Sequence, residues 1–175
     1  GDLTSQNSSK GTAASSPTRY IFHTQNNSKA TIDFGSIASK GNSTRFGDYI
    51  SGGPGHPAAA LLRCCSNQTR AVFAGGYLLI SPYGFVTPQM GAITIASEGN
   101  ATVFGDLTVA RYGVSATSNQ VRGVFAGGQG GNPYPYINTI DFITFASSGN
   151  AQDFGDIDSS VGSAVSDSHG GLGGF

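Results

Sequence analysis

The sequence has little charge and no long apolar run. Charged residues make up 11% of its 175 residues, and the formal net charge is -1. Such sparse charge gives no electrostatic basis for binding nucleic acid or an anionic membrane. No apolar run is long enough to span a bilayer. Leu, Lys and Glu are scarce, which disfavours helices, whereas 27 glycines and many Ser, Thr and Asn suit short strands joined by tight turns.

Cysteine is almost absent, and the two that occur are neighbours, Cys64 and Cys65. Two adjacent cysteines supply neither a disulfide framework nor a metal site. In a strand, alternation would turn Cys64 inward and Cys65 outward as free thiols. A strained vicinal disulfide is the alternative.

Residue types that carry catalysis are also sparse. His23, His56 and His169 lie far apart, without ligand spacing to Cys, Asp or Glu. No Ser-His-Asp or Cys-His order is recognisable. The sequence therefore predicts no catalytic residues, no metal site and no cofactor.

Repeated segments organise what is present. Ser66–Gly76 reads S-N-Q-T-R-A-V-F-A-G-G, and Ser118–Gly128 reads S-N-Q-V-R-G-V-F-A-G-G. A second pair reads A-S-E-G-N-A-T-V-F-G-D-L at Ala96–Leu107 and A-S-S-G-N-A-Q-D-F-G-D-I at Ala146–Ile157, and Ala38–Tyr49 is a more divergent copy. A period of about 50 residues indicates a repeat architecture.

We therefore expect one all-β domain, 1–175, with repeats 1–46, 47–104 and 105–154 and a partial repeat 155–175. The expected strands of the third repeat are Gly113–Thr117, Arg122–Ala126, Thr139–Ala146 and Ala151–Phe154. Those of the second are Leu61–Cys65, Arg70–Ala74, Ala92–Ala96 and Ala101–Phe104, and the first has Arg19–Phe22 and Thr31–Ala38. Gly1-Asp2-Leu3-Thr4 matches the wording of Gly105–Thr108, so we expect a piece of a longer polypeptide or a processed product.

The order of features in a repeat resembles the kelch motif of β-propellers. An apolar strand ends in Gly-Gly, an aromatic-bearing strand follows, and a large aromatic comes next, with Phe where kelch blades usually carry Trp. Arg111 stands where kelch repeats often carry Arg. More narrowly, the wording from Arg122 to Asp156 is similar to repeats in tail-fibre and other appendage proteins of marine bacteriophages. The resemblance implies four-stranded antiparallel blades of a β-propeller-like protein.

The same resemblance implies a function without catalysis. We expect a virion structural protein, a tail-fibre segment that mediates attachment to the host surface; the alternative is an extracellular carbohydrate-binding protein of the lectin type. A galactose-oxidase-like enzyme is disfavoured because no Tyr-Tyr-His-His copper set is recognisable. Three and a half repeats fall short of the usual minimum of about four blades. Either the remaining blades are absent from this chain, or several chains complete the structure together. The expected partners are therefore further copies of the chain, with a trimer favoured, other virion proteins and a host-surface glycan.

Candidate binding residues lie on connections that differ between repeats while the strands recur. Exposed aromatics on Pro-braced loops suit stacking on sugars or packing against a partner protein. Covering the edge of their own blade, or a subunit contact, is the alternative. The candidates are Tyr77, Tyr83, Phe85, Tyr134 and Tyr136.

The recurring residues are assigned structural roles. Diglycines permit sharp turns or close approach, and the aspartates suit turns better than Ca²⁺, whose sites need denser ligands. We expect Arg19, Arg70 and Arg122 each to bond a repeat Asp or the F-G-D turn, and so to space the repeats. Phe73 and Phe125 should be buried at equivalent places, as should Phe46, Phe104 and Phe154. The structural candidates are Arg70, Arg122, Gly75, Gly76, Gly127, Gly128, Asp106 and Asp156.

Overall fold

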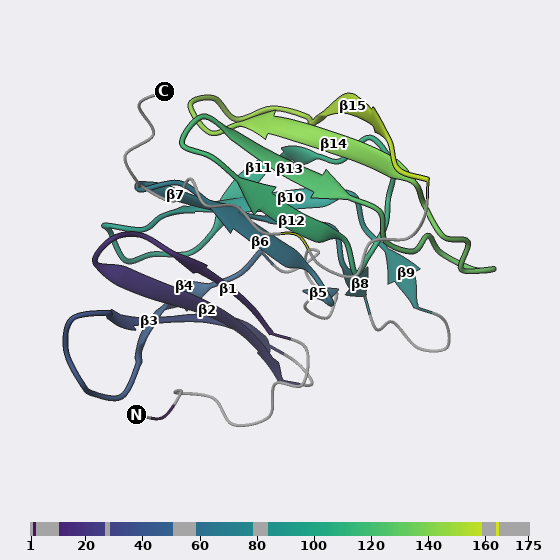
Figure 1. The fold of residues 1–175 in the computed structure, drawn as a ribbon. Coiled ribbons are helices and arrows are strands. Elements are labelled where there is room, and N and C mark those ends of the chain that lie inside the picture. The colour runs from purple at the N-terminus through teal and green to yellow at the C-terminus, as the bar shows by residue number, and fades with distance from the viewer. Residues whose placement is uncertain are drawn as a thin grey trace.

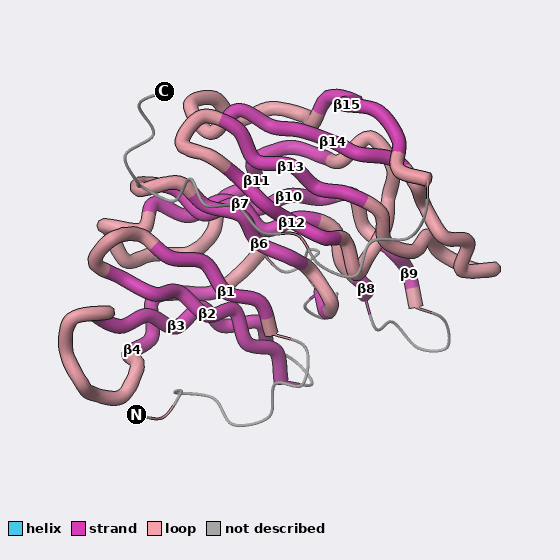
Figure 2. The backbone as a smooth tube through the Cα atoms, in the orientation of Figure 1, coloured by secondary structure: helices cyan, strands magenta, loops and turns pink. Residues whose placement is uncertain are grey.

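The computed structural model describes residues 2, 11–26, 29–50, 59–78, 84–158 and 164, and its regular structure there is all strand (Figures 1 and 2). The expected all-β class is therefore confirmed. Three antiparallel four-stranded sheets follow one another in the chain, and we call them units 1, 2 and 3. Unit 2 lies between the other two (Figure 1).

The strands of each unit are consecutive meanders, interrupted only in unit 2 by a small extra sheet. Unit 1 comprises β1 (Thr12–Ser15), β2 (Arg19–Asn26), β3 (Lys29–Ser36) and β4 (Thr44–Asp48). Unit 2 comprises β6 (Arg63–Ser66), β7 (Arg70–Ala74), β10 (Gln89–Thr94) and β11 (Thr102–Asp106). Unit 3 comprises β12 (Ser115–Ser118), β13 (Arg122–Ala126), β14 (Thr139–Thr144) and β15 (Gln152–Asp156).

The extra sheet pairs β5 (Ala59–Ala60), β8 (Tyr77–Leu78) and β9 (Phe85–Val86). Its strands β8 and β9 lie in the segment that the sequence assigned to a plain connection. The strands expected in the three repeats are all present, with ends displaced by a few residues. The partial repeat 155–175 falls mostly outside the described residues.

The first strands of the three units, β1, β6 and β12, lie side by side (Figure 1). Their last residues, all serines, link them: the Ser66 hydroxyl donates to the Ser15 carbonyl at 2.9 Å, and the Ser118 hydroxyl donates to the Ser66 carbonyl at 2.7 Å. The units therefore meet along one line and spread outward from it.

Two hydrophobic cores fill the spaces between units. One joins Ile21, Ile32 and Phe46 of unit 1 to Phe73 and other residues of unit 2. The other joins the opposite face of unit 2 to unit 3, where Phe125 is buried. Phe73 and Phe125 are both fully buried, as expected from the repeats. Each core belongs to an interface between units, because a single sheet has no interior of its own.

A β-bulge at the same place in every unit explains the F-G-D wording. The pairing of the third strand with the fourth shifts by one residue at Ile32/Asp33, Met90/Gly91 and Ile140/Asp141. The unpaired residue on the fourth strand is the motif Phe, which the bulge turns toward the following unit. Phe46 and Phe104 are thereby buried at 4% and 3% exposure.

Two expectations about burial were wrong, because burial depends on whether another unit covers each face of a sheet. Phe154 is 58% exposed, because the described chain provides no unit after unit 3 to cover it. Cys65 does not face outward: Cys64 belongs to the core toward unit 1 and Cys65 to the core toward unit 3. Both faces of β6 are covered, so strand alternation buries both thiols. They are free, and burial raises the pKa of each.

Candidate binding surface

The diglycines direct the connections that carry the candidate aromatics. Gly75, Gly76, Gly127 and Gly128 all have left-handed φ values, between 65° and 128°. A Cβ on Gly75 would lie 2.4 Å from the carbonyl oxygen of Arg111. Close backbone approach and a sharp turn therefore both require glycine here. After each pair the chain leaves the sheet, and Tyr77 and Gln129 are the first residues outside.

The connections after the diglycines lie at one end of the molecule, where β8, β9 and the β13–β14 connection are found (Figure 1). They carry Tyr77, Phe85, Tyr134 and Tyr136, and Tyr112 comes from the connection between β11 and β12. The Tyr77 and Tyr134 hydroxyls are 3.5 Å apart, which links the two connections. The Tyr77 and Tyr112 rings pack edge-on with centroids 5.3 Å apart. We call the set the aromatic loop surface, and it comprises Tyr77, Phe85, Tyr112, Tyr134 and Tyr136.

Backbone bonds hold this surface in place. Tyr112 and Gln129 exchange backbone hydrogen bonds of 2.9 Å, and the Tyr112 hydroxyl donates to Gln129 Oε1 at 2.7 Å. The Gly130 amide donates to the Pro135 carbonyl, which folds the β13–β14 connection back on itself. The Tyr77 ring lies against Gly84, where a Cβ would be 2.0 Å from the ring. A surface fixed in this way loses little conformational entropy when it binds a ligand.

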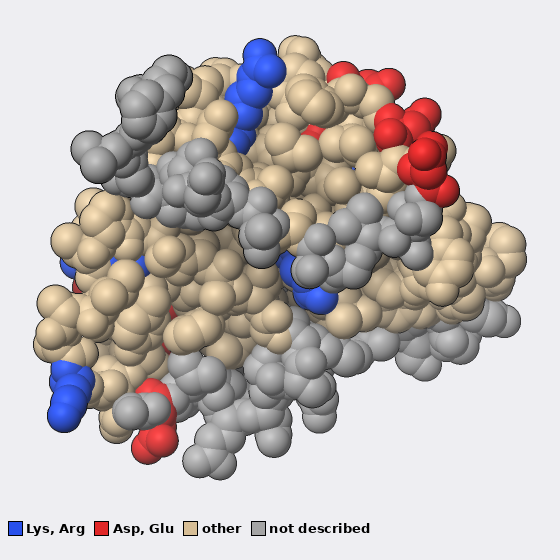
Figure 3. Space-filling view, viewed as in Figure 1, with Lys and Arg blue, Asp and Glu red and all other residues tan. Residues whose placement is uncertain are grey.

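The exposed rings face solvent and carry no formal charge. Tyr136 is 71% exposed, Phe85 55% and Tyr134 45%. The hydrogen bond with Tyr134 raises the pKa of Tyr77, so the Tyr77 hydroxyl stays neutral at ordinary pH. Acidic side chains instead gather along the edge that β15 forms (Figure 3). The aromatic loop surface therefore offers ring faces and neutral hydroxyls, which suit an uncharged polar ligand.

The predicted residues are placed as follows. Tyr77 and Tyr134 come into contact, whereas Phe85 lies in β9 and Tyr136 on the β13–β14 connection, both exposed. Tyr83 lies outside the described residues. Tyr112 and Gln129 were missed by the sequence analysis, since they stand next to Arg111 and Gly128 and carry no signal of their own. Only the pairing of the two connections reveals them.

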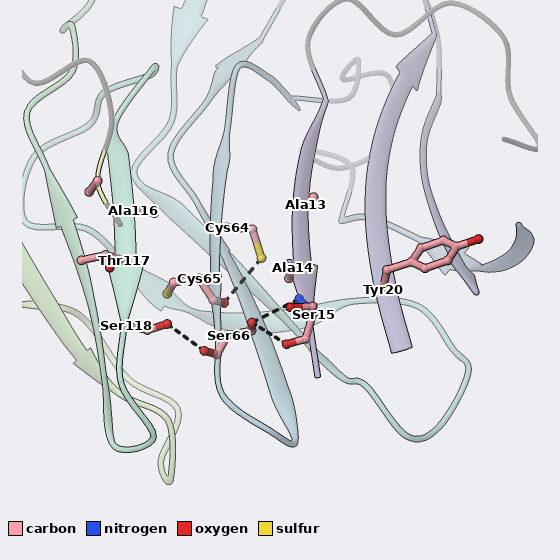
Figure 4. Close-up of a pocket in the computed structure, with 11 residues that line it drawn as sticks. Ala13, Ala14, Ser15, Tyr20, Cys64, Cys65, Ser66, Ala116, Thr117 and Ser118 are labelled. Carbon is pink, nitrogen blue, oxygen red and sulfur yellow. Dashed lines mark hydrogen bonds between the residues drawn. The ribbon is translucent and has the colours of Figure 1, made fainter. Parts of the chain in front are cut away.

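The line of first strands forms a second concavity (Figure 4). Its volume is about 430 Å³, and its lining includes Ala13, Ser15, Ser66, Ala116 and Ser118. The Ser66 and Ser118 hydroxyls are engaged in the bonds between strands described above, and the Ser15 carbonyl accepts one of them. The small side chains allow the strands to approach closely, and this concavity offers fewer recognition groups than the aromatic loop surface does.

The F-G-D turns link each unit to the next one. The Asp48 amide donates to Asn100 Oδ1 at 2.9 Å, and the Asp48 carbonyl accepts from the Ala101 amide at 2.9 Å. Asp106 makes the same pair of bonds to Asn150 and Ala151. The repeated S-x-G-N turn is therefore the acceptor of the preceding F-G-D turn, a role that its wording alone did not indicate.

The repeat arginines also bridge units, but at acceptors other than those predicted. Arg19 Nη1 donates to the carbonyls of Ile95 and Ala96, and Arg70 Nη1 donates to that of Phe145. The acceptors lie after the third strand of the following unit, and the repeat aspartates take no part. The physical reason is distance along the strand: arginine opens the second strand, at the end opposite the F-G-D turn. The Arg122 guanidinium lies over the Phe142 ring, 4.9 Å from its centroid, and within the described ranges it donates to no carbonyl of another unit.

One buried ion pair stabilises unit 3. Arg111 Nη2 lies 3.1 Å from Asp141 Oδ2, and both side chains are fully buried. Asp141 also accepts bonds from the Thr108 amide and hydroxyl. Desolvation lowers the pKa of Arg111, and the charge of Asp141 opposes that shift. This arrangement is enclosed, so it is a structural element and not a surface that a ligand reaches.

Within the part of the chain that the structure describes, no three His, Cys, Asp or Glu side chains gather in a way that would hold a metal ion. The same residues contain no helix long and apolar enough to cross a membrane.

No protein-family model matches the chain, and no curated protein sequence matches it. Solved structures do match, 107 chains in all, among them the one described as "Structure of YjhT". The superposition has a TM-score of 0.66 at 10% sequence identity and covers 85% of this chain and 50% of the YjhT chain. This chain thus spans about half the length of that neighbour. YjhT has a β-propeller-like fold, so the three units are β-propeller-like, and the likeness extends to the fold alone.

Proposed function

We propose that this chain is a non-enzymatic attachment protein whose units are kelch-like propeller blades and whose aromatic loop surface binds a host-surface glycan. The observation that carries the proposal is the meeting of two sequence-variable connections through Tyr77 and Tyr134. Variable loops on a recurrent scaffold are where binding residues concentrate. A fixed cluster of ring faces with neutral hydroxyls suits the apolar faces and hydroxyl groups of a sugar.

The setting that we propose is a phage tail fibre, within the virion. The wording of the repeats supports it, because it is similar to that of phage appendage proteins. The second candidate is an extracellular lectin, which would use the same aromatic loop surface. Labelling of phage particles by antibodies raised against this chain separates the two: bound antibody supports the tail fibre, and unlabelled particles beside free antigen support the lectin.

A glycan array probed with the whole chain tests the binding role. We expect binding to a restricted set of surface glycans. Tyr136→Ala should weaken it about fivefold or more, since stacked rings contribute about 1–3 kcal/mol in comparable contacts. Val121→Ala is the matched control, because Val121 is 60% exposed and lies outside the aromatic loop surface. Binding unchanged by Tyr136→Ala, or weakened equally by the control, would exclude this surface as the binding site.

A further inference from the structure

The face of unit 3 that points away from unit 2 matches two faces that are buried elsewhere in the chain. Phe46 and Phe104 are covered by the next unit, whereas Phe154 at the same place is 58% exposed. Val124 is likewise half-buried where Ile21 and Val72 are fully buried. Unit 3 therefore presents the apolar half of an interface that is complete twice elsewhere in the chain.

The polar half of that interface is also open on unit 3. A Cβ on Gly47 or Gly105 would lie 2.1 Å from a carbonyl of the following unit, whereas around Gly155 there is nothing within 4 Å. Arg19 and Arg70 donate to carbonyls of the following unit. The Arg122 guanidinium, by contrast, has no hydrogen-bond acceptor among the described residues and lies over the Phe142 ring.

Unit 1 presents the complementary half. Phe22 stands where Phe73 and Phe125 stand in units 2 and 3, and Ile37 stands where Ile95 and Phe145 stand; both are exposed in unit 1 alone. The S-x-G-N turn of unit 1 makes the same hydrogen bonds as its counterparts, with Asp2 as the partner. The Asp2 amide donates to Asn42 Oδ1, and the Ser43 amide donates to the Asp2 carbonyl. These are the bonds that Asp48 and Asp106 make to their acceptor turns.

We propose that two copies of this chain join head to tail, the open face of unit 3 in each copy covering the open face of unit 1 in the other. Asp156 of one copy then takes the place of Asp2 at the Asn42–Ser43 turn, and Arg122 gains the carbonyls after β3. Both new interfaces repeat those already present inside the chain. The ring has six units, within the range of about four to eight found in propellers, whereas the trimer expected from the sequence would have nine.

Charge and length support this arrangement. The outer edge of unit 3, β15, carries Asp153 and Asp156, and acidic side chains gather along it (Figure 3). Like charges on an edge strand oppose pairing edge to edge, so association through the sheet face is favoured. The chain also spans 50% of the β-propeller-like YjhT chain, so two copies have about the length of that fold.

Sedimentation equilibrium of the 175-residue chain tests the proposal, and a dimer at micromolar concentration is the expected result. Phe154→Asp places a charge in both new interfaces and should raise the dimer dissociation constant about 1,000-fold, roughly 30-fold for each. Val103→Asp is the control: Val103 has the same 58% exposure, and unit 3 carries Asp153 at the equivalent place. The proposal would be overturned if the chain stayed monomeric at about 100 μM, if it formed a trimer, or if Val103→Asp weakened the dimer as much as Phe154→Asp does.

Mixing two defective variants tests the direction of the contact. Phe154→Asp spoils only the unit 3 face, and Phe22→Asp spoils only the unit 1 face, so each alone should be monomeric. In a mixture, one interface joins two intact faces, and a heterodimer should form. Dimerisation of either variant alone would show a symmetric contact of like faces, and it would exclude the head-to-tail ring. Failure of the mixture to associate, with the wild-type chain dimeric, would also exclude that ring.

The chain contains no tryptophan, so a single introduced one reports burial without background. With Phe154→Trp, the emission should shift to the blue as the protein concentration rises through the dissociation constant. Val103→Trp should stay red-shifted throughout. A concentration-independent red emission from Phe154→Trp in a dimeric sample would place that residue outside the contact and refute the proposal.

Discussion

Replacing Arg111 by methionine tests whether the ion pair in unit 3 is as enclosed as its geometry indicates. Arg111 and Asp141 have no exposed side-chain surface. The guanidinium also donates weakly to the carbonyls of Phe125 and Val109, at 3.3 and 3.4 Å. Methionine fills similar volume but leaves the Asp141 carboxylate with the Thr108 donors alone. An unpaired buried charge is the dominant cost, and hydrophobic packing offsets little of it.

The expected loss is about 3–5 kcal/mol in the free energy of unfolding. Removing both charges together, as Arg111→Met with Asp141→Leu, should cost clearly less than the two single substitutions summed, because neither charge is then left alone. The control is Arg45→Met, whose ion pair with Asp48 leaves the two side chains 52% and 46% exposed. An exposed pair contributes about 0–1 kcal/mol.

Urea unfolding followed by circular dichroism measures all four variants. We expect a large decrease in the free energy of unfolding for Arg111→Met and a small one for Arg45→Met. The double variant should recover part of the stability that Arg111→Met loses. Losses below about 1 kcal/mol for Arg111→Met, or strict additivity in the double variant, would mean that water reaches the pair and that the enclosed geometry is wrong.

Three further substitutions test the packing between units. Burial lowers the pKa of His23 to about 4. As pH falls below about 6.5, the unfolded chain therefore binds the proton before the folded chain does, and the free energy of unfolding should drop by roughly 3 kcal/mol between pH 6.5 and 4. Urea unfolding of His23→Leu over the same pH range should not show this loss. Gly47→Ala should cost about 1–3 kcal/mol through its clash with the next unit, whereas Gly41→Ala, in open space, should stay within about 0.5 kcal/mol. Phe125→Ala should cost about 3–5 kcal/mol by thermal unfolding, and Val121→Ala almost nothing.

The sequence was sufficient for the strands and the repeat, because both depend on local patterns. The F-G-D motif recurs in every unit, and the diglycine recurs in units 2 and 3 but not in unit 1. The burial of Phe73 and Phe125 at equivalent places therefore followed from alignment alone. Phe154 shows the limit of that reasoning. Phe154 stands in the same F-G-D motif as Phe46 and Phe104, but its burial depends on a following unit, which the local sequence pattern does not specify.

The candidate surface was predictable only as a set of residues. The differing loops and their aromatics marked Tyr77 and Tyr134, since variable connections on a recurrent scaffold stand out in an alignment of repeats. Their contact, and the part played by Tyr112 and Gln129, depends on how two connections separated by a whole unit fold toward each other. Long-range pairing of this kind has no period that a single sequence reveals.

The bonds between units explain how such loops can vary freely. The F-G-D turn donates and accepts through its backbone, and Arg19 and Arg70 also bond backbone carbonyls. The side chains that this interlock requires are few: the Asn of the acceptor turn, the arginine, and glycines where a Cβ would strike the next unit. All lie at the ends of the second, third and fourth strands, away from the residues that follow the diglycine. Changes in the aromatic loop surface therefore leave the spacing of the units intact.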